Sequence, residues 1–371
     1  MIFLQPNFVK SVIDLACTIQ QIPGPTFLET ERAAFMFEQF KSLGLLDVTL
    51  DSAGNVLGRL PGASNTRPLV VSAHLDTVHP LGTSLDLQHF ENRIVGPSIG
   101  DNSLGLAGLL ALPRMLAARQ FSLPGDLWLA ANVAEEGLGN LKGMQAVVDR
   151  FGSRPIAYLV LEGMGLGNVL HRGLGVERYK VSVHTPGGHS WADFGQPSAI
   201  HELCALVNRL TSLPLPHHPC TSLNVGMIRG GTSVNTIAAQ AWLELDLRSE
   251  DSQTLTHLVN QVHEVVRSAS RPDVQASLVL IGKRQAGSLS TTHPLVELAR
   301  QVITQIGMQP HLDTASTDAN LPLSRKYPSI CIGLTLGNNA HSKDEFILTA
   351  PVEDGLRQLY ELVTRAWEVM R

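Results

Sequence analysis

The sequence predicts an α/β protein in which a mostly parallel sheet, covered by helices on both faces, is interrupted by an inserted second domain. Four continuous apolar runs, typical of parallel strands buried on both faces, occur at residues 68–78, 127–136, 156–163 and 329–337. From Gly175 to about Gly287, apolar and polar residues alternate instead, which indicates strands with one exposed face. The length of 371 residues is also typical of two domains.

The first domain is expected to begin with two helices. Apolar residues recur at helical spacing at Phe8, Val12, Leu15 and Ile19. A second helix is expected around residues 29–43, and a strand then leads into a turn at residues 51–55. Three of the buried strands follow, with helical segments between them. Helical segments and the fourth buried strand come after the inserted domain. The first domain is therefore expected to be discontinuous, comprising residues 1–174 and 287–371.

The inserted domain, residues 175–286, is expected to have the β-α-β-β-α-β order of a ferredoxin-like fold. Its two helices are expected at residues 198–210 and 252–268, because apolar residues lie along one stripe of each segment. Its alternating strands are expected at residues 176–185, 221–228, 239–248 and 274–281.

The composition argues against several kinds of partner. Lys+Arg number 28 and Asp+Glu 33, and no block of like charge occurs, so nucleic-acid binding is not expected. The sequence has no signal-peptide pattern and no run of about 18 apolar residues, so no membrane association is expected. The four cysteines form no Cys-x-x-Cys pair and no disulfide framework. We therefore expect a cytoplasmic protein that binds a small molecule.

Residues that can bind metal end or follow all four apolar runs. In chain order these residues are His74 and Asp76, Glu135 and Glu136, Glu162, and His341. A single His-x-Asp would be no more than a polar strand end, but the carboxyl ends of parallel strands meet at the edge where α/β proteins bind ligands. Two histidines and several carboxylates suit Zn²⁺ or a similar divalent cation, and one carboxylate could bridge two ions.

Asp101 and the Glu135-Glu136 pair add to this pattern. Asp101 precedes an apolar helical segment, and taken by itself it is well explained as an ordinary helix N-cap. Neighbouring side chains on an extended segment point in opposite directions, so one glutamate can bind metal while the other faces a substrate. A carboxylate in that second position can take a proton from water and pass it to a leaving amine.

In combination, these motifs resemble the co-catalytic zinc exopeptidases and deacylases of metallopeptidase clan MH. That family includes glutamate carboxypeptidase, peptidase T, acetylornithine deacetylase, succinyl-diaminopimelate desuccinylase and aminoacylase. The matching motifs are SAHLDTV at 72–78, GDN at 100–102, EE at 135–136, Glu162, GGHS at 187–190 and AHSKDE at 340–345. The resemblance implies a zinc-exopeptidase catalytic domain and makes the inserted domain a lid and dimerisation domain.

The resemblance also implies roles for the site residues. His74 and Glu162 would bind one of two divalent ions, Glu136 and His341 the other, and Asp101 would bridge them, followed by a cis peptide bond. The ions would be Zn²⁺ first, with Co²⁺ or Mn²⁺ as alternatives. Asp76 would orient His74, and Glu135 would be the general base and then the general acid.

Three residues of the inserted domain match family positions that contact substrate. His189 would reach the active site of a partner subunit and stabilise the oxyanion, which implies a homodimer; otherwise it is a surface histidine beside a turn. Asn235 and Arg248 would bind substrate, and Arg248 suits a carboxylate. The alternating strand that carries Arg248 is equally typical of a solvated sheet face.

The function expected is hydrolysis of amide bonds in a small peptide or an N-acyl amino acid. Glutamate at position 162 goes with carboxypeptidases and N-deacylases of the family, whereas peptidase T-like aminopeptidases and tripeptidases usually have aspartate there. A carboxypeptidase-like exopeptidase or N-acyl-amino-acid deacylase is therefore the first hypothesis, and an aminopeptidase the second. A non-catalytic metal- or peptide-binding relative is disfavoured because it would not need Glu135. A phosphoesterase is disfavoured because the chain lacks a His-x-His-x-Asp-His cluster and a glycine-rich phosphate loop.

Overall fold

The structure, a computed structural model, describes residues 5–63 and 66–370. Contacts between Cα atoms divide the chain into two units. Unit 1 comprises the residues up to Gly173 and from Gly287 onward, and unit 2 comprises Leu174–Ala286. Each unit has a hydrophobic core of its own.

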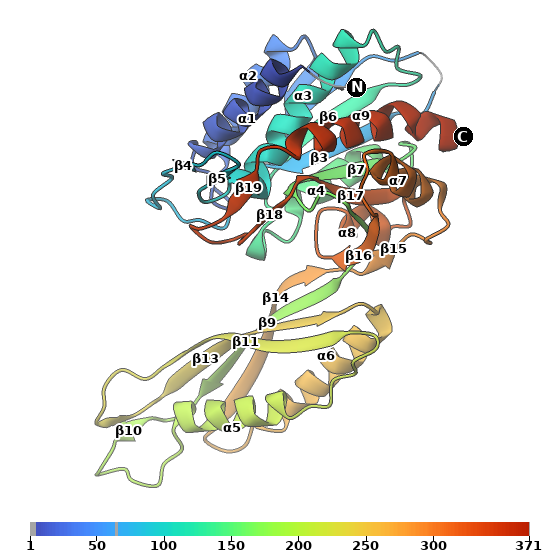
Figure 1. The fold of residues 1–371 in the computed structure, drawn as a ribbon. Helices are drawn as coiled ribbons and strands as arrows, with labels where there is room; N and C mark the ends of the chain where they lie inside the picture. Colours follow the sequence, from blue (N-terminus) through green and yellow to red (C-terminus); the bar gives the residue numbers. More distant parts are fainter. Residues whose placement is uncertain (1–4, 64–65, 371) are drawn as a thin grey trace. The chain divides into compact units, whose positions relative to one another are not determined.

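Unit 1 is built on a nine-stranded sheet with the order β1-β2-β6-β3-β7-β17-β8-β15, in which β16 also pairs with β8. Figure 1 labels its strands β3, β6, β7 and β17. The strands are β1 (Leu46–Leu50), β2 (Val56–Leu60), β3 (Leu69–His74), β6 (Leu127–Asn132), β7 (Tyr158–Met164), β8 (Asn168–Gly173), β15 (Gly287–Ser288), β16 (His311–Ala315) and β17 (Ser329–Thr335). The four central strands, β6, β3, β7 and β17, run parallel. This confirms the predicted α/β fold and its parallel sheet.

Helices cover both faces of this sheet, which explains why its central strands are apolar at successive positions. Within β3, Leu69 and Val71 belong to one hydrophobic core, and Val70 belongs to another. The first core includes residues of α1 (Pro6–Gln20), α2 (Thr30–Ser42), α3 (Gly105–Ala118), α7 (Pro294–Gln305) and α9 (Val352–Val369). The second includes residues of α4 (Lys142–Phe151) and α8 (Asn320–Ser324).

A small antiparallel sheet in unit 1 has the order β18-β19-β5-β4. Its strands are β4 (Gln88–His89), β5 (Arg93–Val95), β18 (Gly337–Asn338) and β19 (Phe346–Leu348). Strand β18 follows β17 closely and pairs with β19, so the turn between them lies just beyond the carboxyl end of a central strand. The AHSKDE motif occupies that turn.

Unit 2 contains a four-stranded antiparallel sheet with the order β11-β13-β9-β14. Its elements are β9 (Gly175–His184), β10 (Gly188–His189), α5 (Ala199–Thr211), β11 (Thr221–Gly230), β12 (Thr236–Ile237), β13 (Gln240–Ser249), α6 (Ser252–Arg267) and β14 (Gln275–Arg284). Its four long strands and two helices therefore follow one another in the order β-α-β-β-α-β. Alternate residues of β9 and β13 pack with the apolar stripes of α5 and α6, which explains the alternating sequence.

None of the helices in the described part of the chain is long and apolar enough to span a membrane.

Gly173 and Gly287 lie opposite each other in the antiparallel pair β8–β15, so the chain leaves and re-enters unit 1 at adjacent positions. We expect that replacing residues 174–286 with a two-residue Asn-Gly turn will close a hairpin there, because such turns join adjacent antiparallel strands. The shortened chain should retain near-UV circular dichroism and unfold in one cooperative thermal transition. A shortened chain without a cooperative transition would contradict this expectation.

Candidate metal centre

The four parallel strands of unit 1 bring potential metal ligands to one edge of the sheet. His74 is the last residue of β3, and Glu162 lies near the carboxyl end of β7. Glu135 and Glu136 follow β6, although this strand ends at Asn132, earlier than the expected strand at 127–136. His341 lies in the turn between β18 and β19. The parallel direction of these strands is what gathers the side chains.

Asp101 lies in an irregular turn, Ile99–Leu104, that precedes α3, and the backbone angles of Asp101 and Asn102 are not helical. The peptide bond between Asp101 and Asn102 is cis, as the resemblance implies. The backbone amides of Gly100 and Asp101 donate to Glu345 Oε1 at 2.7 and 2.8 Å. Asn102 Nδ2 donates to the carbonyl of Leu161 in β7 at 2.8 Å. These contacts fix the turn against the strand that carries Glu162.

The two carboxylate oxygens of Asp101 face two different histidines. Asp101 Oδ1 lies 3.1 Å from His74 Nε2, and Asp101 Oδ2 lies 3.2 Å from His341 Nε2. His74 Nε2 is also 3.5 Å from Glu162 Oε2, and His341 Nε2 is 3.2 Å from Glu136 Oε1. Two ligand groups therefore share Asp101, and within each group the ligand atoms lie within 4.8 Å of one another.

The donor set fits two divalent cations. Zinc binds histidine nitrogen and carboxylate oxygen at about 2.0–2.2 Å, so two ligands of one tetrahedral ion lie roughly 3.3 Å apart. The distances from His74 Nε2 and His341 Nε2 to their carboxylate oxygens in the two groups are all close to that value. A carboxylate with one oxygen in each group is suited to bridge a pair of ions. Unit 1 thus has candidate ligands for two metal ions.

The charges of this cluster favour positive charge between the carboxylates. Burial acts against ionisation of Asp101, but hydrogen bonds to His341 and His74 outweigh it and hold the pKa of Asp101 well below its usual range. Hydrogen bonds to Asp101 and Glu136 raise the pKa of His341 to about 10. Burial raises the pKa of Glu162 to about 7, although His74 opposes this effect. Divalent cations bound here would stabilise these carboxylates as anions.

Asp76 contacts both His74 and the backbone of Glu135 and Glu136. Its Oδ1 and Oδ2 accept the backbone amides of Glu135 and Glu136, each at 2.9 Å, and Oδ2 also accepts the Thr26 hydroxyl. His74 Nδ1 lies 3.0 Å from the backbone carbonyl of Asp76 and 3.6 Å from its carboxylate. The predicted contact between Asp76 and His74 is therefore closer through the main chain than through the carboxylate.

Glu135 lies in the same neighbourhood as the candidate ligands. It is buried, and it can place a carboxylate oxygen within 4.8 Å of ligand atoms of both His74 and Glu136. A carboxylate in this position is close enough to the candidate metal centre to exchange a proton with a group bound there.

His189 lies in the short β10–β12 pair of unit 2. Its Nδ1 accepts the backbone amides of Trp191 at 3.2 Å and Ala192 at 3.3 Å, and its own amide donates to Asp193. An Nδ1 that accepts leaves the proton of the neutral imidazole on Nε2, so Nε2 can donate. This is the protonation that the predicted role at an oxyanion requires.

Asn235 and Arg248 are also in unit 2 and have local partners. The side-chain carbonyl of Asn235 accepts the Ser233 hydroxyl at 2.6 Å. Arg248 Nε donates to Asp246 Oδ2 at 2.6 Å, and Arg178 Nε donates to Asp246 Oδ1. Both interpretations of Arg248, a substrate ligand and a member of a charged sheet face, agree with this arrangement.

Sequence reasoning assigned no role to Glu345 and Asp318. Glu345 belongs to the AHSKDE motif, but its bonds to the Asp101 turn depend on the path of a distant loop. Asp318 lies in the segment 316–320, which resembles a segment near the site in some family members but is equally typical of a turn. The buried Asp318 accepts Asn132 Nδ2 at 2.7 Å, at the end of β6. The AHSKDE motif was therefore a signal in the sequence that Glu345 lies at the site, whereas the signal for Asp318 was weak.

The profile of peptidase family M20/M25/M40 matches residues 70–367. The chain belongs to this family. Members of the family hydrolyse peptide and related amide bonds, so the predicted resemblance and the predicted class of enzyme are both confirmed. The match spans both units of the chain.

Relatives within the family carry different names. The chain is 26% identical to succinyl-diaminopimelate desuccinylase of Corynebacterium glutamicum, over 68% of the chain and 70% of that enzyme. It is 27% identical to the cytosol non-specific dipeptidase of Escherichia coli, over 69% of the chain and 57% of that enzyme. It is 22% identical to the uncharacterised protein YqjE of Bacillus subtilis, over 93% of the chain and 94% of that protein.

Solved structures share the fold. A tripeptidase from Staphylococcus aureus superposes with a TM-score of 0.81 at 17% identity, covering 97% of this chain and 99% of its own. The aminopeptidase PepT from Bacillus cereus gives a TM-score of 0.78 at 19% identity, with coverages of 96% and 98%. YxeP from B. subtilis, described as a dinuclear metal-binding peptidase, gives 0.71 at 13% identity, with coverages of 98% and 100%.

The shared position of Asp101 predicts unequal effects of two substitutions on metal binding. Asp101→Ala should weaken binding of both ions at least about tenfold, because it removes an oxygen from each group. Glu162→Ala should weaken mainly the ion beside His74. Metal stoichiometry measured by mass spectrometry after dialysis against graded chelator checks this, with the surface variant Asp149→Ala as a control. Two tightly bound ions in Asp101→Ala would contradict the assignment.

Proposed function

We propose that this family member is a dinuclear metal-dependent hydrolase, and that it acts as a carboxypeptidase-like exopeptidase or an N-acyl-amino-acid deacylase. The observation that carries the proposal is the Asp101 carboxylate, whose two oxygens face His74 and His341 beside a buried Glu135. This arrangement combines two candidate metal sites with a separate carboxylate that can move a proton.

His74 and Glu162 would hold one ion, Glu136 and His341 the other, and Asp101 would bridge them. Zn²⁺ is the first choice, and Co²⁺ or Mn²⁺ suit the same mixed nitrogen and oxygen donors. Two such ions, when bound, would polarise the scissile carbonyl and make water a better nucleophile at neutral pH. Asp76 keeps the backbone of Glu135 and Glu136 in place through the two amides it accepts.

Glu135 would carry the proton. It would accept a proton from the attacking water and then donate it to the nitrogen of the leaving group, which departs as a neutral amine. Its burial supports this role, because few water molecules compete for the proton in a site of low exposure.

Unit 2 would serve substrate binding and assembly. A proton on His189 Nε2 would stabilise the oxyanion in the active site of a partner subunit, and Asn235 and Arg248 would contact the substrate. The role of His189 requires either a homodimer formed through unit 2 or closure of unit 2 as a lid, and we propose the homodimer. Sedimentation velocity tests the assembly: a monomer that keeps full activity after His189→Ala would contradict it.

The substrate would carry a free carboxylate. The family resemblance associates a glutamate at position 162 with this class of substrate, and one relative is named as a desuccinylase. The named aminopeptidase and tripeptidase among similar folds keep a peptidase T-like activity as the alternative. We also propose that the protein works in the cytoplasm, since its four cysteines are all free thiols.

Replacing Glu135 with Gln should lower kcat by about 10²–10⁴-fold, the usual contribution of a general acid-base group. Bound metal should remain at the wild-type level, because Glu135 is outside the proposed ligand sets. Steady-state kinetics and metal analysis on the same preparation check both expectations. The neighbouring Glu136→Gln is the matched control, which should lose metal as well as activity. An active Glu135→Gln enzyme would refute the mechanism.

A panel of dipeptides with and without an N-acyl group separates the two substrate classes. The first hypothesis expects hydrolysis of N-acylated compounds that keep a free C-terminal carboxylate, and loss of turnover when that carboxylate is amidated. Product formation followed by liquid chromatography checks this. A requirement for a free N-terminal amine would instead establish the aminopeptidase alternative.

A further inference from the structure

Four consecutive backbone amides lead from β6 to the glutamates of the candidate site, and each donates to a side chain from another part of unit 1. After Asn132 the chain has left β6, so these amides are bonded to side chains and not to a neighbouring strand. The pairs are Val133 N with Asn55 Oδ1 at 3.0 Å, Ala134 N with Glu29 Oε1 at 3.0 Å, Glu135 N with Asp76 Oδ1 at 2.9 Å, and Glu136 N with Asp76 Oδ2 at 2.9 Å.

The conformation of this segment, residues 133–136, depends on those acceptors. Ala134 has a φ of 56°, in the left-handed region that residues with a Cβ atom disfavour. Strained backbone of this kind persists where surrounding contacts hold it, and it is frequent at active sites. Because Ala134 directly precedes Glu135, a change in its backbone angles would turn the side chain of Glu135 away from its present direction.

Glu29 provides the acceptor at this strained residue. It is buried at the start of α2, and its Oε1 accepts the amides of both Phe27 and Ala134. Asn55 acts similarly one residue earlier, because its Nδ2 is itself held by Asp51 and by the carbonyl of Gly143. Each acceptor residue therefore has at least one further hydrogen bond besides the one to the segment.

We propose that Glu29 is a positioning residue for catalysis, supported by Asn55: its carboxylate holds residues 133–136 so that Glu135 is aimed at the substrate and Glu136 at metal. Glu29 acts through Glu135 and does not touch the reacting atoms. This inference rests on the proposed function of Glu135 as the proton carrier.

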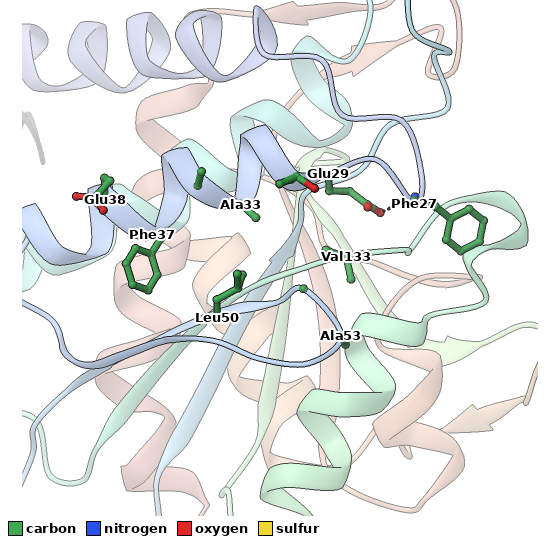
Figure 2. A pocket seen from close by; sticks show the side chains of 11 residues that line it. Phe27, Glu29, Ala33, Phe37, Glu38, Leu50, Ala53 and Val133 are labelled. Atoms are coloured by element: carbon green, nitrogen blue, oxygen red, sulfur yellow. Dashed lines mark hydrogen bonds between the residues drawn. The ribbon is translucent and has the colours of Figure 1, made fainter.

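The surroundings of Glu29 supply a matched control. Glu29 and Glu38 both line an apolar pocket of about 420 Å³ between α2 and the β1–β2 turn, together with Phe37, Leu50 and Val133 (Figure 2). The Glu38 carboxylate accepts from Lys41 and holds none of the four amides. A change at Glu38 therefore alters a carboxylate of the same pocket and helix without altering the bonds to residues 133–136.

Two substitutions at Glu29 separate position from charge. Glu29→Gln keeps an acceptor oxygen at the same reach and removes the charge, whereas Glu29→Asp keeps the charge and withdraws the oxygen by about one carbon–carbon bond, roughly 1.5 Å. We expect Glu29→Asp to lower kcat by about tenfold or more, because small displacements of catalytic groups cost 10- to 100-fold. KM and metal stoichiometry should stay at wild-type values. Glu29→Gln and Glu38→Asp should stay within about twofold of wild type.

The measurements are kcat, KM, bound metal and unfolding temperature for the full-length metal-loaded enzyme and each variant. A wild-type kcat in Glu29→Asp would overturn the proposal, and so would an equal loss in Glu29→Gln or a loss of metal that accounts for the lost activity. If Glu29 had only a structural role, Glu29→Asp would lower the unfolding temperature, but its kcat would not fall below that of Glu29→Gln and Glu38→Asp. An active Glu135→Gln enzyme would refute the proposed function itself, whereas an inactive one beside a fully active Glu29→Asp would refute only this inference.

Discussion

The shared carboxylate of Asp101 is the constraint on which the rest of the site depends. Its two oxygens meet histidines that are 267 positions apart in the chain, His74 at the end of β3 and His341 after β18. The loop that carries His341 also carries Glu345, which accepts the amides of Gly100 and Asp101. One loop therefore sets both the second histidine and the backbone of the residue it must face, so the two cannot move independently.

Six acids at or near the candidate site divide into two kinds by the groups that their carboxylate oxygens contact. Asp76, Glu345 and Glu29 each accept two backbone amides, and these hydrogen bonds act against the rise in carboxyl pKa that burial causes. Asp101, Glu136 and Glu162 instead face histidine nitrogens. An uncompensated buried charge costs several kcal/mol, on the order of 3–5 for a broken ion pair. Divalent cations would stabilise the second kind further, whereas the first kind holds the backbone of the turn and the segment that carry Asp101, Glu135 and Glu136.

The sequence predicted the parts of this site that depend on local pattern. Continuous apolar runs mark strands covered on both faces, and polar residues at their ends converge because parallel strands end at one edge. The same pattern predicted a strand that continues to Glu136, although β6 ends at Asn132. That error has a physical cause: residues 133–136 remain hydrogen-bonded, but to side chains of Asn55, Glu29 and Asp76. No periodicity in the sequence records such partners, since they come from three distant segments.

The contrast between the site and its surroundings explains why the class of reaction is better determined than the substrate. Relatives of this chain are named as a desuccinylase and as a dipeptidase, so the names within one family refer to different substrates. The groups assigned to that chemistry, apart from His341, are largely buried and fixed by main-chain contacts. His189 and Asn235, by contrast, are exposed and lie beside glycine-rich turns, where a changed side chain disturbs no core packing. Under the roles proposed for His189 and Asn235, substrate selection would vary at such positions while the carboxylates around Asp101 stay unchanged.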